Sequence, residues 1–99
     1  MIRHVVMWRV RGASAEERRA NAETVRRAFE GLRGQVPGLA RLDVGIDTSG
    51  VDYACDVVLV SDFDSAESLA AYAEHPAHLA ARAAVGDLRI ARHQVDHPL

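Results

Sequence analysis

The sequence predicts an α+β fold of the ferredoxin-like type, with the element order β-α-β-β-α-β. Three observations support this: four stretches rich in β-branched and aromatic residues, two amphipathic stretches that begin at capping signatures, and turns rich in glycine and proline. Elements in this order form a four-stranded antiparallel sheet with both helices on one face. With 99 residues the chain is long enough for one core, so a single domain over residues 1–99 is expected.

The first predicted strand covers residues 2–10. Side chains alternate between the two faces of a strand, so these residues divide into two sets. The more apolar set is Ile2, His4, Val6, Trp8 and Val10, and the other is Arg3, Val5, Met7 and Arg9. His4 in the apolar set is consistent both with a hydrogen-bonded histidine at the edge of the core and with a site residue.

The first predicted helix begins at a capping box formed by Ser14 and Glu17. It is expected to run to about residue 32 or 33 and to end at Gly34, because glycine suits the left-handed position after a helix. The spacing i, i+3, i+4 and i+7 predicts one buried stripe. That stripe is Val25, Ala28, Phe29 and Leu32.

A turn at residues 36–38 leads to the second predicted strand, residues 39–46, and residues 47–50 are expected to form a hairpin-type loop. The third strand is predicted from Tyr53 to about Val60. It holds the most apolar run of the chain, which favours a central place in the sheet. Cys55 falls within this strand and is expected to be a buried, unreactive thiol.

The second predicted helix begins at a capping signature over residues 64–67 and meets His75 and Pro76. Its expected inward face is Ala66, Leu69, Ala70 and Ala73. Residues 77–85 form a further helical piece that ends at Gly86, and residues 88–95 form the last strand.

Charge and composition exclude several classes of function. The net charge of −2 argues against nucleic acid or an acidic membrane as a partner, since both require a basic excess. One cysteine cannot form an intramolecular disulfide, no signal peptide is recognised, and no apolar run approaches the ~18 residues of a membrane span. A cytoplasmic protein is therefore expected.

The predicted sheet has helices on one face only, yet its first and third strands carry apolar residues on both faces. Apolar surface of this kind requires a cover, and a second copy of the chain is the simplest one. The sequence therefore predicts a homodimer in which the two sheets pack against each other.

The stretch from Tyr72 to His78 carries the candidate chemistry. Pro76 has no N–H to give to a helix and disfavours helical geometry at His75, so the helix should break there. The break would let Tyr72 and His78 point into one space, which His4 could reach from the first strand. A neutral imidazole is a good general base near pH 7, and a phenol can donate a hydrogen bond to a carbonyl oxygen. The combination suits proton abstraction next to a carbonyl group.

Other interpretations remain open for each residue of this stretch. Tyr72 could be an aromatic that packs helix on sheet, His75 a cap, and His78 a surface imidazole. A metal site is disfavoured because the proline disrupts the shared face that a histidine pair requires, and no cysteine pair or carboxylate stands at matching spacing. No metal and no cofactor are expected.

Four sequence stretches resemble the stress-responsive α/β-barrel (Dabb) family. They are IRHVV at residues 2–6, VPGL at 36–39, DVG at 43–45 and YAEHPAH at 72–78. The resemblance covers nearly the whole chain in the same order. It implies ferredoxin-like chains whose two sheets form a dimeric α/β barrel. Many members have no established activity, whereas olivetolic-acid-cyclase-like polyketide cyclases close a poly-β-keto chain by intramolecular aldol condensation without a cofactor.

In that cyclase branch the catalytic pair is the tyrosine before His-Pro and the second histidine of the motif, which are Tyr72 and His78 here. The resemblance also implies that His4 lines the pocket. Other expected pocket-lining residues are Val6, Trp8, Val25, Phe29 and His75. Two functions are carried forward: a cofactor-free cyclase or lyase acting on a small apolar carbonyl compound, and a non-catalytic stress-response barrel that acts through ligand binding or oligomerisation.

Overall fold

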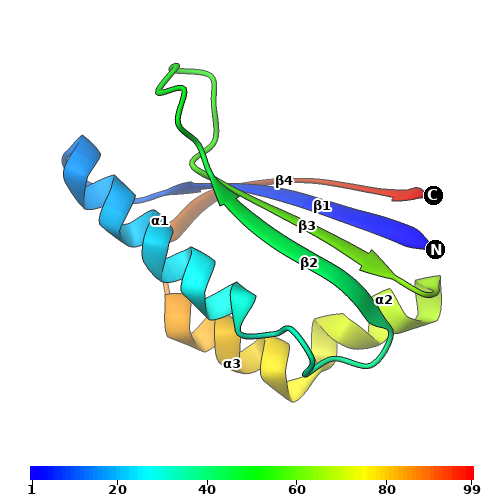
Figure 1. Ribbon diagram of the computed structural model, residues 1–99. Coiled ribbons are helices and arrows are strands. Elements are labelled where there is room, and N and C mark those ends of the chain that lie inside the picture. Colours follow the sequence, from blue (N-terminus) through cyan, green and yellow to red (C-terminus); the bar gives the residue numbers. More distant parts are fainter.

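The computed structural model describes residues 1–99 as one sheet covered on one face by helices (Figure 1). The elements are β1 (Ile2–Val10), α1 (Ala15–Glu30), β2 (Leu39–Ile46), β3 (Val57–Phe63), α2 (Ala66–Glu74), α3 (Pro76–Val85) and β4 (Arg89–Pro98). This confirms the predicted ferredoxin-like fold, with the second helix in two pieces. None of the helices combines the length and the apolar character that crossing a membrane requires.

All neighbouring strands are antiparallel, in the order β2-β3-β1-β4. β1 and β3 are therefore the central strands, which confirms the central place predicted for the third strand. Alternation along β1 sends His4, Val6, Trp8 and Val10 under the helices, where all four are buried. The opposite, open face of β1 carries Arg3, Val5, Met7 and Arg9, of which Met7 is exposed.

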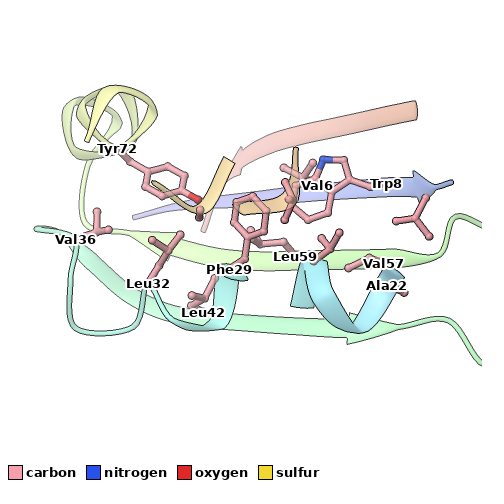
Figure 2. Close-up of a cluster of buried hydrophobic side chains, with 14 of the residues drawn as sticks. Val6, Trp8, Ala22, Phe29, Leu32, Val36, Leu42, Val57, Leu59 and Tyr72 are labelled. Carbon is pink, nitrogen blue, oxygen red and sulfur yellow. The ribbon is translucent and has the colours of Figure 1, made fainter. Parts of the chain in front are cut away.

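The core lies between the helices and the covered face of the sheet (Figure 2). Phe29 of α1 stacks on Trp8 of β1, with ring centroids 4.9 Å apart. The predicted stripe of α1 is confirmed: Val25, Phe29 and Leu32 are buried and Ala28 packs against them. Burying each large aliphatic or aromatic side chain contributes about 1.5–3 kcal/mol, so this layer dominates stability.

The predicted start of the third strand at Tyr53 is wrong. β3 begins only at Val57, and Tyr53 lies 84% exposed in a loop over residues 47–56. The loop closes through hydrogen bonds from the Asp47 N–H to the Asp56 carbonyl (2.9 Å) and from the Val10 N–H to Asp56 Oδ2 (2.8 Å). Figure 1 shows the loop projecting to the side of the sheet opposite the helices. Cys55 is consequently a half-buried loop residue and not a core thiol.

Two helix predictions also need correction. α1 ends at Glu30, and its continuation to Gly34 consists of single turns in which the N–H of Leu32 and of Arg33 bonds three residues back. In α2, Ala66, Ala70 and Ala73 are exposed, whereas Leu69 and Tyr72 face the sheet. Large side chains bury more apolar area than alanine, so they decide which side of this short helix faces inward.

Candidate active site

The predicted helix break is present between α2 and α3. His75 is extended (φ −65°, ψ 137°), and its N–H bonds to the Tyr72 carbonyl at 3.1 Å. Its ring then caps α3, because Nδ1 accepts the Ala77 N–H at 3.0 Å. Pro76 stands at the first position of α3, where the missing N–H costs nothing. His75 is thus a capping residue whose Nδ1 is occupied by the Ala77 N–H, and not the pocket-lining residue that was expected.

The break brings Tyr72 and His78 together. Their ring centroids lie 4.4 Å apart at an angle of 52°. On a straight helix, residues six apart point to different sides. The Tyr72 ring also packs 5.1 Å from Phe63 and 6.2 Å from His4, so the sheet forms the other wall of the site. Figure 2 shows Tyr72 reaching from its helix into the layer between helices and sheet.

His78 is held in the form that a general base requires. Its Nδ1 lies 3.1 Å from the Ala73 carbonyl oxygen, which can only accept, so Nδ1 carries the hydrogen. Nε2 is then left with its lone pair in the neutral ring. Burial, together with the Arg82 charge, lowers the pKa of His78 below 6.5 against the opposing effect of this hydrogen bond. The ring therefore stays neutral at pH 7.

Tyr72 is held as a donor. The residue is 6% exposed. Burial raises the pKa of Tyr72 to about 12, despite the opposing charges of Arg92 and Arg89. The phenol remains protonated at neutral pH and has a hydrogen to give.

His4 meets a partner that the sequence did not identify, Asp96. Its Nδ1 lies 2.5 Å from Asp96 Oδ1, and Gln94 Nε2 donates to the other oxygen of the same carboxylate at 2.9 Å. The β1–β4 register places His4 directly opposite Asp96. The last strand was predicted to end at residue 95, which left Asp96 in a tail. Arg92, Gln94 and Asp96 stand at every second position and so share one face of a strand. This spacing was the signal that could have extended the predicted strand to Asp96.

The predicted apolar pocket is not open in this chain. Val6, Val25 and Phe29 are packed in the core, each at most 1% exposed. None of the four main hollows is lined by these three residues, or by His4, Tyr72, His75 or His78. Trp8 alone of the predicted lining residues reaches one, between α3 and β4. The apolar side chains of a helix and a sheet fill the space between them by direct packing.

A larger hollow, of about 540 Å³, lies at the open face of the sheet and the loop over residues 47–56. Met7, Val58 and Tyr53 are among its lining residues. Elsewhere on this face Arg3 binds both oxygens of Asp62, at 2.8 and 3.0 Å. No cluster of three or more histidine, cysteine, aspartate or glutamate side chains in the chain could hold a metal ion.

The structure is that of a ferredoxin-like α+β protein in which Tyr72 and His78 meet across a break between two helices. Residues 2–99 match the model of the stress responsive A/B barrel domain, and the chain belongs to this family. An uncharacterized protein of Streptomyces coelicolor is 36% identical over 81 residues, which is 81% of each chain.

Solved structures share the fold. A dimeric ferredoxin-like protein of unknown function from Thermobifida fusca is 28% identical, with a TM-score of 0.82 over 99% of this chain and 90% of its own. A dimeric protein of unknown function from Bacteroides fragilis reaches a TM-score of 0.86 at 24% identity, over 99% of this chain and 95% of its own.

Proposed function

We propose that the chain binds a small carbonyl compound at Tyr72 and His78 and acts on it by cofactor-free acid/base chemistry of the cyclase or lyase kind. The observation that carries the proposal is the meeting of the two rings across the Pro76 break, 4.4 Å apart. Each ring is in the protonation state its role requires. Because the main hollows do not open at this pair, ligand entry requires Tyr72 and His78 to move apart.

The proposed reaction is an intramolecular aldol closure. His78 Nε2 takes a proton from the carbon next to a ketone, and the electron pair moves to the ketone oxygen, which accepts a hydrogen bond from the Tyr72 hydroxyl. The enolate carbon then bonds to a second carbonyl carbon of the same molecule. The alkoxide formed takes the proton back from His78. Donation by a buried phenol stabilises the enolate more than water does.

His4 acts as a positioning residue in this scheme. The Asp96 carboxylate accepts the Nδ1–H of His4 and so fixes the orientation of the imidazole ring. Nε2 then points away from Asp96. His4 packs against Tyr72 and limits the orientations of the phenol ring. Asp96→Asn would therefore change the rate of ring closure by altering the orientation of the Tyr72 ring, while His78 keeps its position.

The test is the ring closure of 2,6-heptanedione in D₂O, followed by proton NMR, which reports both the product and exchange of the hydrogens next to each carbonyl. His78→Gln should lower both rates by about 10²–10⁴-fold, as loss of a general base does. Tyr72→Phe should lower ring closure by about 10²–10³-fold. His93→Gln and Tyr53→Phe, at exposed positions, are the matched controls. Equal rates in parent and both site variants would remove the pair from the chemistry.

The second candidate is a barrel that binds a ligand without transforming it. Tyr72 is only 6% exposed, and a ligand held beside it without reaching the hydroxyl would not be transformed. In the same NMR experiment it would give line broadening of the ligand without exchange or product.

Self-association through the open face is part of both candidates. Val5, Val58 and Val60 lie beside one another there through strand pairing, and Met7 and Val95 are exposed on the same face. The similar proteins from Thermobifida fusca and Bacteroides fragilis are described as dimeric. A second copy packed sheet to sheet would cover this surface.

A further inference from the structure

Three arginines gather at a hollow of about 340 Å³ between α3 and β4. Arg82 comes from α3, Arg89 and Arg92 come from β4, and Trp8 of β1 also lines the hollow. None of the three guanidinium groups forms an ion pair with a carboxylate of the chain. The hollow, defined here as the arginine hollow, is therefore a concentration of uncompensated positive charge in a chain of net charge −2.

A β-bulge places two of these arginines on the same face. Arg92 pairs with Trp8 and Ala91 with Arg9, but Val10 then pairs with Arg89, so Ile90 is an extra residue. In a regular strand, residues three apart point to opposite faces. The extra residue restores Arg89 to the helix-covered side, beside Arg92. Bulges of this kind often redirect a side chain next to a functional site.

Two of the three guanidinium groups, those of Arg89 and Arg92, have contacts within the chain. Arg89 lies over the rings of Trp8 and Phe29, with its central carbon 5.1 and 5.3 Å from their centroids. Arg92 donates a hydrogen bond to Gln94 Oε1. Burial, with the nearby charges of Arg92 and Arg82, lowers the pKa of Arg89. An anion placed among the three groups would relieve their mutual repulsion.

Trp8 supplies an independent indication of a ligand. Its side chain is 2% exposed, and its Nε1–H has no hydrogen-bond partner. Figure 2 shows the indole nitrogen on the edge of the ring turned away from Phe29 and Leu59. Buried donors in native proteins are nearly always paired, so an unpaired one calls for an explanation. The nitrogen is closed to solvent, so an acceptor oxygen in the arginine hollow would reach it only if the surrounding side chains shift.

We propose that the arginine hollow binds a carboxylate group, with the guanidinium groups of Arg82, Arg89 and Arg92 as donors. The hollow adjoins the Tyr72–His78 pair, because the Phe29 ring lies 6.2 Å from the His78 ring by centroids and 5.3 Å from the central guanidinium carbon of Arg89. Arg82 also follows His78 by one turn of α3. On the basis of the proposed function, the ligand is then a keto acid whose carboxylate lies here and whose carbonyl lies at Tyr72 and His78.

The test uses 5-oxohexanoate and its neutral methyl ester as probes. Trp8 is the only tryptophan, so its fluorescence reports binding at the hollow, and calorimetry gives the affinity. The acid should bind at least about 10-fold more tightly than the ester, since hydrogen bonds to charged groups contribute about 1.5–3 kcal/mol. This preference should shrink as sodium chloride is added. Equal binding of acid and ester, or binding of neither, would overturn the proposal.

Variants localise the effect. Arg82→Gln and Arg92→Gln should each weaken binding of the acid by about 10-fold and leave that of the ester unchanged. Arg27→Gln, an exposed arginine of α1 without an ion-pair partner, is the matched control. Arg82 is exposed, so its replacement leaves the core intact. An equal loss in Arg27→Gln would show a general charge effect and contradict the proposal. Inorganic phosphate binding more tightly than 5-oxohexanoate would assign the hollow to phosphate groups instead.

The two proposals fail separately. Tyr72→Phe and His78→Gln should slow ring closure by the factors given above while the preference for the acid over the ester is retained. If the parent shows that preference but no turnover, the catalytic proposal fails and the arginine hollow stands. If the parent closes the diketone but binds acid and ester equally, the hollow fails and the acid/base pair stands.

Discussion

The two faces of the sheet are built from the same strands but differ in how much of their apolar surface the chain itself covers. On the helix-covered face, Trp8, Leu59 and Phe63 are almost fully buried by side chains of the same chain. On the open face, Met7 and Val95 remain exposed, and Arg3 forms an ion pair with Asp62. The covered face is completed by this chain, whereas the open face has apolar surface left for a partner.

The proposed site lies on the covered face, where burial shifts the pKa values of its two side chains. Burial there keeps the Tyr72 phenol protonated and the His78 ring neutral. On the open face, the strong hydrogen bonds between Arg3 and Asp62 have the opposite effect and favour the charged forms of both groups. The helix-covered face therefore favours the neutral forms of Tyr72 and His78, and the open face favours the charged forms of Arg3 and Asp62.

The largest expected difference between the faces is in stability. Phe29→Ala should lower the free energy of unfolding by about 3–5 kcal/mol, because it leaves a cavity beside Trp8. Urea denaturation should show this loss at every protein concentration. Met7→Ala on the open face is the control and should have a smaller effect that depends on concentration. Equal, concentration-independent losses would mean that the open face needs no partner.

Charge on the open face should act on association. Val60→Asp is expected to convert the proposed dimer to a single chain, since a carboxylate buried between two sheets would be unpaired. Sedimentation at micromolar concentration measures the mass. Ala20→Asp, on the exposed side of α1, serves as the matched control and should leave the mass unchanged. A parent chain that is already monomeric would contradict the inference that a partner covers the open face.

Acid should remove the stabilisation that the Arg3–Asp62 ion pair provides. The hydrogen bonds from Arg3 hold the pKa of Asp62 below 3.8, so the folded state binds this proton less readily than the unfolded chain. The stabilisation is fully present above pH 3.8 and is lost as the pH falls through the lower pKa of the folded state. Asp62→Asn should flatten this part of a stability-against-pH curve, and Asp87→Asn, at an exposed position, should not.

The smallest expected effect is the titration of His78 on the covered face. Burial lowers the pKa of His78 below 6.5, so the midpoint of the fall in the rate of ring closure should lie at a pH below 6.5. The unfolded chain takes up the proton first, and stability should also decline as the pH falls below 6.5. NMR titration of the ring, assigned by comparison with His78→Gln, measures the midpoint. A midpoint above 6.5 would contradict the effect of burial.

The sequence by itself determined what depends on neighbours along the chain. Ser14 caps α1 as predicted, and the faces of β1 follow from alternation. The break at Pro76 follows from the absence of an N–H. The same local reasoning failed at residues 53–56. Tyr53 and Cys55 are residue types typical of a strand, but they lie in a loop outside the sheet. Strand preference is weaker than the pairing that Val57 makes with Trp8.

Only the tertiary structure decided which distant residues share a site. Asp96 reaches His4 across 92 positions of sequence because β4 pairs with β1 in one register. The bulge at Ile90 turns Arg89 to the side of Arg92, and no local pattern marks it. Val25 and Phe29 have the apolar character expected of pocket residues, yet dense packing against the sheet makes them core. Register and packing are set by the free energy of the whole chain, which local sequence does not contain.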